Sequence, residues 1–144
     1  MSAKDYLCKI KYDREYIRQL RLRKETMHID YNGISGIDYS RDKIKASPVN
    51  KLEEQAWKLL ETMQDIDKSI AELSLDINRK LDEIHSIDNG LYSQILFMRY
   101  SEYKSFERIA VDLNYNYHYV CQLHGEALKL FTDKVLTNSL TNLN

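Results

Sequence analysis

Three side chains with metal-binding or nucleophilic chemistry lie close together near the C-terminus: His118, Cys121 and His124. Imidazole and thiolate groups are good zinc ligands, and a thiol beside a histidine is one form of a catalytic nucleophile. A structural zinc site takes four ligands, however, and an α-helix would turn His124 away from His118. No oxyanion-stabilising group is recognisable nearby. The sequence therefore predicts no metal site, no cofactor and no enzymatic activity.

The same stretch suits the reading of DNA bases. The amide of Gln122 can bond to both N6 and N7 of adenine, and Asn116 can cap the helix that carries it. Basic side chains just before this helix can bind phosphate. The predicted DNA-binding residues are Lys104, Arg108, Asn116, Tyr117, His118, Cys121 and Gln122. The alternative is a solvated glutamine on a helix that binds nothing.

Base-reading side chains need a rigid support, and residues 105–131 have the pattern of a helix-turn-helix. Two amphipathic segments flank the polar turn at residues 114–116. Ala110 supplies the small residue where two such helices touch. One face of the second segment is an apolar stripe of Val120, Leu123, Ala127 and Phe131. Tyr115 and Tyr119 either pack the turn against a support helix or stack on bases and bond phosphates.

The segment at residues 91–100 is apolar and predicts the helix that supports this pair. The C-terminal module would then contain three helices within residues 89–132. The remaining residues, 133–144, are polar, and we expect this tail to fray.

The central part of the chain predicts one long helix. Ser47 and Pro48 mark its start, because serine caps free N–H groups and proline fits the first turn. A heptad seam follows, formed by Val49, Leu52, Ala56, Leu59, Met63, Ile66, Ile70, Leu73, Ile77, Leu81 and Ile84. So narrow a seam must pack against another helix, either the N-terminal one folded back antiparallel or the same helix of a second copy. We expect Asn89 and Gly90 to end the helix with a left-handed cap.

A first helix is predicted over residues 3–27, where Asp13 and Lys24 interrupt the apolar spacing. Residues 29–47 contain turn signals and predict a long loop that carries an interaction or is partly disordered. The predicted fold is therefore all-α. A long antiparallel helical hairpin or coiled-coil stalk, residues 1–88, precedes the three-helix helix-turn-helix module.

Charge is distributed unevenly along the 144 residues, although the net charge is only −1. Residues 1–45 carry +4, residues 46–88 carry −5 and residues 89–144 are neutral. Two packed helices would neutralise each other in this way. Alternatively, a basic edge binds phosphate through Lys11, Arg14, Arg18 and Arg21.

The chain shows no feature of a membrane or secreted protein. No apolar run approaches the roughly 20 residues of a membrane span, and the N-terminus lacks the apolar core of a signal peptide. Cys8 and Cys121 form no disulfide framework. We therefore expect a cytoplasmic protein without a membrane partner.

Three stretches of the C-terminal third carry a family resemblance. They are Arg99-Tyr100, Phe106-Glu-Arg-Ile-Ala-Val-Asp-Leu-Asn-Tyr115 and Val120-Cys-Gln-Leu-His-Gly-Glu-Ala-Leu128. Together they resemble region 4 of bacterial sigma factors. More closely, the chain is similar to small Firmicutes phage and prophage proteins with such a C-terminus, related to the RinA-type and ArpU-type regulators of phage late transcription. The start of the recognition helix differs, because sigma region 4 has several arginines where this chain has Tyr117 to Cys121.

The resemblance implies sequence-specific binding of double-stranded DNA and contact with RNA polymerase in a bacterial host cell. A second class of function is a phage-encoded inhibitor or adaptor that uses the helix-turn-helix as a scaffold for a protein partner. The neutral C-terminal block is compatible with this alternative. A homodimer through the long helix is a further expectation to test.

Overall fold

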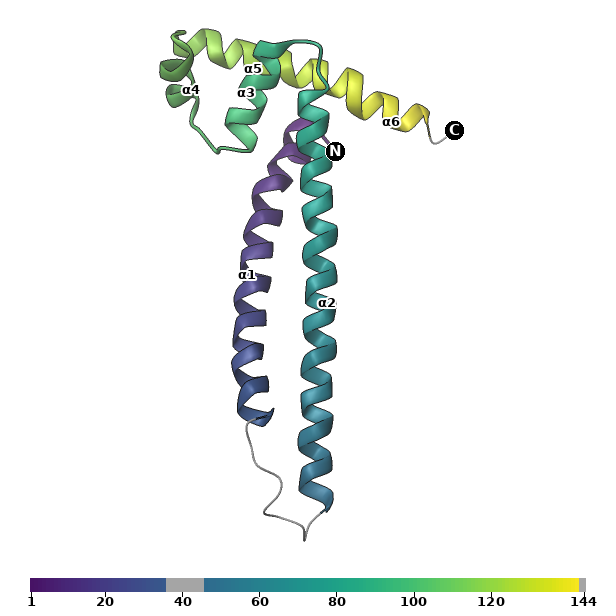
Figure 1. Cartoon of the computed structure of the whole chain (residues 1–144). Coiled ribbons are helices and arrows are strands. Elements are labelled where there is room, and N and C mark those ends of the chain that lie inside the picture. Colours follow the sequence, from purple (N-terminus) through teal and green to yellow (C-terminus); the bar gives the residue numbers. More distant parts are fainter. Residues whose placement is uncertain (36–45, 143–144) are drawn as a thin grey trace. The chain divides into compact units, whose positions relative to one another are not determined.

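The computed structural model describes residues 1–35 and 46–142, and every regular element in these ranges is helical (Figure 1). The two long helices are α1 (Ala3–Ser35) and α2 (Ala46–His85). Three shorter helices follow, α3 (Gly90–Tyr100), α4 (Phe106–Leu113) and α5 (Tyr117–Phe131). The π-helical segment η2 (Thr132–Leu136) then leads into α6 (Thr137–Thr141). The predicted all-α class is confirmed.

The chain divides into two compact units, each with residues from both long helices. Unit 1 comprises Met1–Arg14 and Leu75–Asn144, and unit 2 comprises Glu15–Ser74. The first turns of α1 belong to unit 1, where Leu7 and Ile10 are fully buried. This division does not follow the predicted boundary at residue 88, because contacts between the two ends of the chain cannot be read from a local pattern.

The core of unit 1 is built where α3, α4 and α5 meet. Its buried residues are Ile95, Met98, Ile109, Ala110, Val120 and Leu123. The N-terminal turns add to the same unit, since the ring of Tyr6 packs against Phe131 with 6.0 Å between centroids. Burial of this many apolar side chains from different helices holds the unit together.

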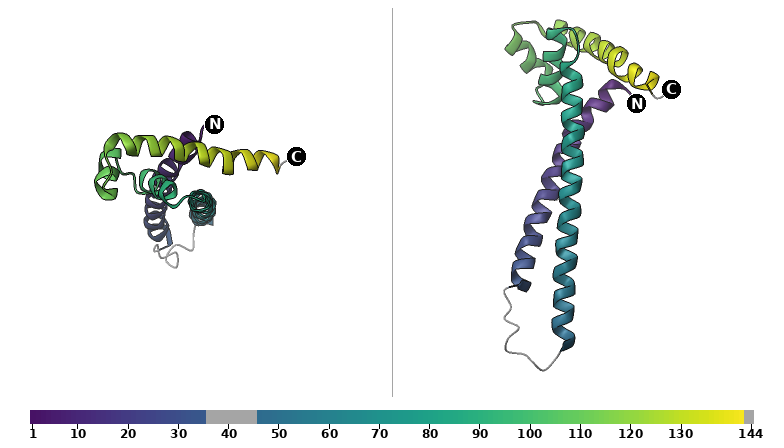
Figure 2. Two further views of the ribbon diagram at one scale, coloured as in Figure 1. Left: turned by 90° about the horizontal axis from the view of Figure 1, so that it is seen from above. Right: turned by 45° about the vertical axis from the view of Figure 1, so that its right-hand side comes forward.

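The C-terminal tail is helical as far as Thr141, so the prediction that residues 133–144 fray is wrong for 133–141. Figure 2 shows α5, η2 and α6 following one another along nearly one axis. Polar side chains of the tail donate to carbonyls one turn earlier, such as Ser139 Oγ to Val135 O at 2.8 Å. Val135 is also buried, and Lys134 forms an ion pair with Asp88. The local hydrogen bonds, the burial of Val135 and the Lys134–Asp88 pair together stabilise a helix that composition alone did not predict.

The structure also differs from two further predictions, the long loop at residues 29–47 and the left-handed cap at Asn89 and Gly90. Helix α1 continues to Ser35, so residues 29–35 of the predicted loop 29–47 are helical, whereas 36–45 lie outside the described residues. Helix α2 ends at His85. Asn89 does not form a left-handed cap but starts α3, in an extended conformation with φ −133°, and its side chain accepts from the N–H groups of Leu91 and Tyr92. Asparagine is as good an N-cap as it is a turn residue.

In unit 2, the parts of α1 and α2 lie side by side and run in opposite directions. Lys24 Nζ pairs with Asp67 Oδ1 at 2.6 Å, and a later residue of α1, Asp30, shares a hollow with an earlier residue of α2, Leu59. Met63 and Ile66 of the predicted seam are buried, whereas its neighbours Leu59, Ile70 and Leu73 are half-buried. The seam therefore faces the interior, as its period predicts.

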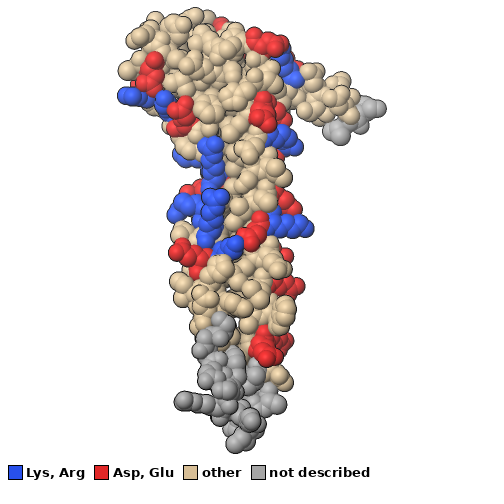
Figure 3. Space-filling model, viewed as in Figure 1, with Lys and Arg blue, Asp and Glu red and all other residues tan. Residues whose placement is uncertain are grey.

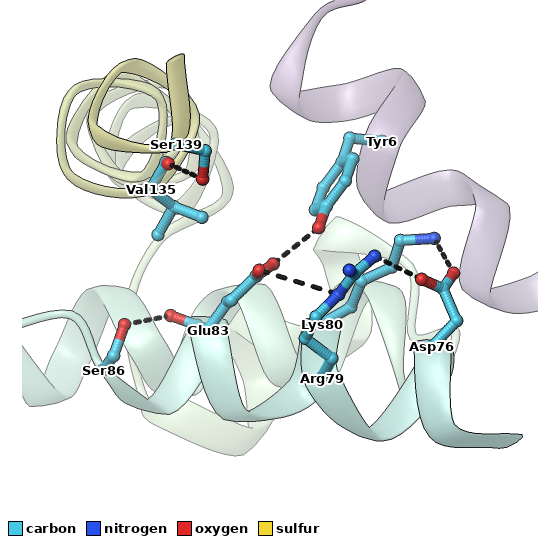
Figure 4. A network of polar contacts seen from close by, with 8 residues as sticks. All are labelled: Tyr6, Asp76, Arg79, Lys80, Glu83, Ser86, Val135 and Ser139. Atoms are coloured by element: carbon cyan, nitrogen blue, oxygen red, sulfur yellow. Dashed lines mark hydrogen bonds and ion pairs between the residues drawn. The ribbon is translucent and has the colours of Figure 1, made fainter. Parts of the chain in front are cut away.

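A polar network in unit 1 joins α1 to the last turns of α2 (Figure 4). Lys80 is only 2% exposed, and its Nζ pairs with Asp76 Oδ2 at 2.8 Å and lies 4.9 Å from the centroid of the Tyr6 ring. The Tyr6 hydroxyl donates to Glu83 at 2.7 Å, and burial together with this bond raises the pKa of Tyr6. Asp13 is also buried, and one of its carboxylate oxygens has no hydrogen-bond partner among the described residues.

Candidate nucleic-acid interface

Capping side chains fix both sides of the turn between α4 and α5. Ser105 Oγ accepts from the N–H of Arg108 at 3.2 Å, and Asn116 Oδ1 accepts from the N–H of Tyr119 at 2.7 Å. Asn114 ends α4 in the left-handed conformation, with φ 56°. Asparagine tolerates this region because its short polar side chain bonds locally. The predicted bounds of the two helices and the cap at Asn116 are confirmed.

Helix α5 separates an apolar face from a polar one. The buried residues are the predicted Val120, Leu123, Ala127 and Phe131. On the other side, His118 and Gln122 are exposed and Cys121 is half-buried. The first turn of α5 is also accessible, because Tyr117 is 42% exposed. Four predicted site residues therefore share one accessible surface, which we call the outer face of α5: Tyr117, His118, Cys121 and Gln122.

Gly125 lies on the outer face, and nothing in the fold requires a glycine there. A Cβ atom at this position would meet no atom within 4 Å. Glycine inside a helix costs about 1 kcal/mol relative to alanine. Its usual compensation is the close approach of another group, and no described residue of the chain makes that approach. The chain itself therefore leaves room for a larger side chain at Gly125.

The side-chain amide of Gln122 forms one hydrogen bond within α5. Its Nε2 donates to Glu126 Oε1 at 3.1 Å, while the Tyr92 hydroxyl donates to the other oxygen of Glu126 at 2.6 Å. These two bonds, with Tyr92 first, lower the pKa of Glu126. The arrangement holds the amide in a defined orientation, with its carbonyl and one N–H directed elsewhere.

The two predicted phosphate ligands are paired with carboxylates. Lys104 Nζ lies 2.9 Å from Asp112 and 3.2 Å from Glu102, and Arg108 Nε lies 3.1 Å from Asp112. The hydrogen bond from Lys104 lowers the pKa of Asp112, and Asp112 in turn raises the pKa of Lys104. The structure thus brings Lys104 and Arg108 together in a cluster without net charge. Arg108 remains 66% exposed and can still reach a phosphate.

Tyrosine rings surround the N-terminal end of α5. Tyr115 and Tyr119 meet edge to face with 5.1 Å between centroids, and Tyr117 meets His118 in the same way at 5.6 Å. Hydrogen bonding with Cys121 raises the pKa of Tyr117. Tyr115 and Tyr119 are about 40% exposed, so they pack on each other and still present ring surface to a partner.

His124 is placed away from the outer face. Its Nε2 is 2.9 Å from the Tyr100 hydroxyl, and its ring lies 4.8 Å from that of Phe106. Burial, followed by the nearby charge of Arg99, lowers its pKa to about 4. The ring is therefore a neutral packing element between α3, α4 and α5. No group of His, Cys, Asp and Glu among the described residues could hold a metal ion.

The chain was compared with known proteins at three levels. No family model, no curated protein and no solved structure matches it. Within the described ranges, no helix combines the length and apolar character needed to cross a membrane.

Proposed function

We propose that the protein is a sequence-specific DNA-binding regulator of phage or prophage transcription. The observation that carries the proposal is the α4–α5 pair, in which one face of the second helix is buried and the other is accessible from its first turn. In a helix-turn-helix, such a second helix enters the major groove with its N-terminal residues on the base edges. Here those residues are Tyr117, His118, Cys121 and Gln122.

The roles of the individual residues follow from their chemistry. Gln122 reads adenine through its amide, and the tyrosine and histidine rings contact bases or sugars. Arg108 contacts phosphate through its exposed guanidinium, and Lys104 joins it when the Asp112 carboxylate is exchanged for a phosphate oxygen. Asn116 fixes the start of the recognition helix. Contact with RNA polymerase in a bacterial cell is proposed from the resemblance to sigma region 4.

A protein-interaction module is the second candidate, and a specific observation favours it. Lys104 and Arg108 are matched by acidic partners, and residues 89–144 carry no net charge. DNA affinity depends strongly on unmatched positive charge. A partner protein has no such requirement, so the outer face of α5 could contact an inhibited or recruited protein.

The long helices are proposed to form an antiparallel hairpin within one chain. Two observations in unit 2 support this proposal, the Lys24–Asp67 ion pair and the burial of Met63 and Ile66. The alternative is a homodimer through the same seam. Light scattering at two protein concentrations decides between them, because finding only monomer at both concentrations would exclude the homodimer.

A mobility shift with phage promoter DNA at several salt concentrations tests the function. A DNA-binding module should lose affinity with a slope of about −0.9 per phosphate contact in a plot of log K against log salt. The Arg108→Gln variant should flatten this slope by about one unit, whereas Lys51→Gln, which removes an exposed charge of α2, should leave it unchanged. Absence of salt-dependent binding to any duplex would favour the protein-interaction module.

A further inference from the structure

A second candidate site lies in unit 1, between the first turns of α1 and the C-terminal end of α3. It is a hollow of about 250 Å³ lined by Cys8, Lys11, Tyr12, Arg99, Tyr100 and Tyr103. Water occupies roughly 30 Å³ per molecule in the liquid, so the hollow has room for a small organic ligand. No residue of the outer face of α5 lines it, which makes it distinct from the proposed DNA-reading surface.

Two of the six residues that line the hollow carry positive charges that the fold does not pair with carboxylates. Lys11 and Arg99 line it, and Arg14 lies about one turn further along α1. No carboxylate among the described residues comes within ion-pair distance of these three cations. Lys104 and Arg108 of the same unit are both paired, by contrast. Basic side chains also gather over α1 in Figure 3. Unmatched cations at a concave site favour an anionic ligand.

Both guanidinium groups are held in place by neutral partners. Arg14 donates to the carbonyl oxygen of Ser101 at 2.8 Å and to the Tyr103 hydroxyl at 3.1 Å. Arg99 donates to the carbonyl oxygen of Lys104 at 2.9 Å and stacks 4.4 Å from the ring centroid of Phe106. A guanidinium has five N–H donors. Each arginine therefore keeps donors for a phosphate group, and its position is fixed before the ligand arrives.

Tyr103 supplies an aromatic wall in an unusual conformation. Its φ is 60°, in the left-handed region that residues other than glycine and asparagine rarely adopt. Two cations lie beside its ring, with Lys11 Nζ 5.6 Å and Arg14 Cζ 5.8 Å from the centroid. The ring of Tyr12, which is 73% exposed, also lines the hollow. Aromatic rings beside fixed cations suit a ligand that combines a planar group with an anion.

We propose that this hollow binds a nucleotide. Its phosphate would contact Lys11 and Arg99, with Arg14 adding positive charge beside Tyr103, and its base would lie against Tyr103 and Tyr12. Neither a free phosphate nor an uncharged nucleoside would use both features. The inference does not depend on the proposed DNA binding, because the two sites share no residue.

Protection of Cys8 from alkylation tests the proposal, with Cys121 as an internal control on another face of the unit. Iodoacetamide labelling of each thiol is followed by mass spectrometry while a nucleoside 5′-monophosphate is titrated, one for each of the four common bases. We expect at least one nucleotide to slow labelling of Cys8 and not of Cys121. Inorganic phosphate and the matching nucleoside should need concentrations at least about tenfold higher.

Two variants assign the effect to the hollow. Lys11→Gln removes an exposed cation outside the core and should raise the half-protecting nucleotide concentration about tenfold, the equivalent of one charge-assisted bond. Lys51→Gln makes the same charge change in unit 2 and should have no effect. Tyr103→Gly relieves the backbone and removes the ring, so it should weaken nucleotide protection more than phosphate protection.

Several outcomes would overturn the assignment. If inorganic phosphate protected Cys8 as well as the nucleotide does, the base would not contribute to binding. If the nucleoside protected Cys8 equally well, the cations would not contribute. If no nucleotide protected Cys8, the hollow would not be a nucleotide site. The same would follow if Lys51→Gln raised the half-protecting concentration as much as Lys11→Gln does. Protection by duplex DNA at lower concentration than by any nucleotide, weakened by Lys11→Gln, would make the hollow a contact for the DNA backbone instead.

Discussion

Units 1 and 2 bury their side chains to different depths, although both contain parts of the same two long helices. The largest fully buried side chains all belong to unit 1, among them Leu7, Ile84, Ile95 and Phe131. In unit 2 the seam contains buried Met63 and Ile66, but their neighbours in it are half-buried. Two helices can cover each other along only one stripe, whereas several converging helices enclose a side chain from all directions.

This difference has a consequence for dynamics and for function. Segments with few buried apolar contacts open at a lower free energy than a closed core. We therefore expect unit 2 to exchange its amide hydrogens faster than α3, α4 and α5. The proposed base reading requires side chains held on rigid elements, and the outer face of α5 belongs to the more deeply buried unit 1.

The largest expected effect is in the seam of unit 2. Replacing Ile66 with Asp places a charge without a partner at a buried position and should cost about 3–5 kcal/mol. Hydrogen exchange followed by mass spectrometry should show faster exchange in peptides from unit 2. Gln64→Asp introduces the same charge at an exposed position of α2 and serves as the control. Equal exchange in both variants would mean that the seam is not paired.

Local patterns predicted the C-terminal helices well and the long-range contacts poorly. The bounds of α4 and α5 followed from capping residues and from one apolar stripe, since both act within a few residues. The contact of Lys80 with the Tyr6 ring and the place of Leu7 in unit 1 depend on segments far apart in sequence. The pairing of Arg108 with Asp112, four residues apart on α4, was a local signal that could have been recognised.

A second prediction concerns unit 1 and pH. The pKa of His124 is lowered to about 4 from 6.5, so the unfolded chain binds more protons between these values. The stabilisation is present above pH 6.5 and is lost as the pH falls toward 4. Because the ring is partly exposed, we expect a loss of about 1–2 kcal/mol.

Urea denaturation at pH 7 and at pH 4.5 measures this loss. The His124→Phe variant should show a smaller difference between the two pH values than the wild type. His118→Phe changes an exposed histidine and should match the wild type. An unchanged difference in His124→Phe would assign the pH dependence to another group.

The smallest expected effect is at Gly125. Alanine fits this helical position without a clash and should stabilise unit 1 by about 0.5–1 kcal/mol. If a partner approaches the outer face of α5 closely, the same methyl group should weaken binding. For Gly125→Ala, thermal unfolding should therefore show higher stability, and a binding titration should show lower affinity. Higher stability with unchanged affinity would mean that the partner does not contact this position.

Gln122→Ala tests most directly whether the outer face of α5 reads DNA sequence. A specific duplex is first selected from a random library with the wild-type protein. Affinity for this duplex and for random DNA is then measured for the wild type, Gln122→Ala and Arg108→Gln at one salt concentration. We predict that Gln122→Ala loses about 1–3 kcal/mol on the selected duplex and little on random DNA, whereas Arg108→Gln weakens both alike. Equal losses on both duplexes for Gln122→Ala would contradict sequence reading by this face.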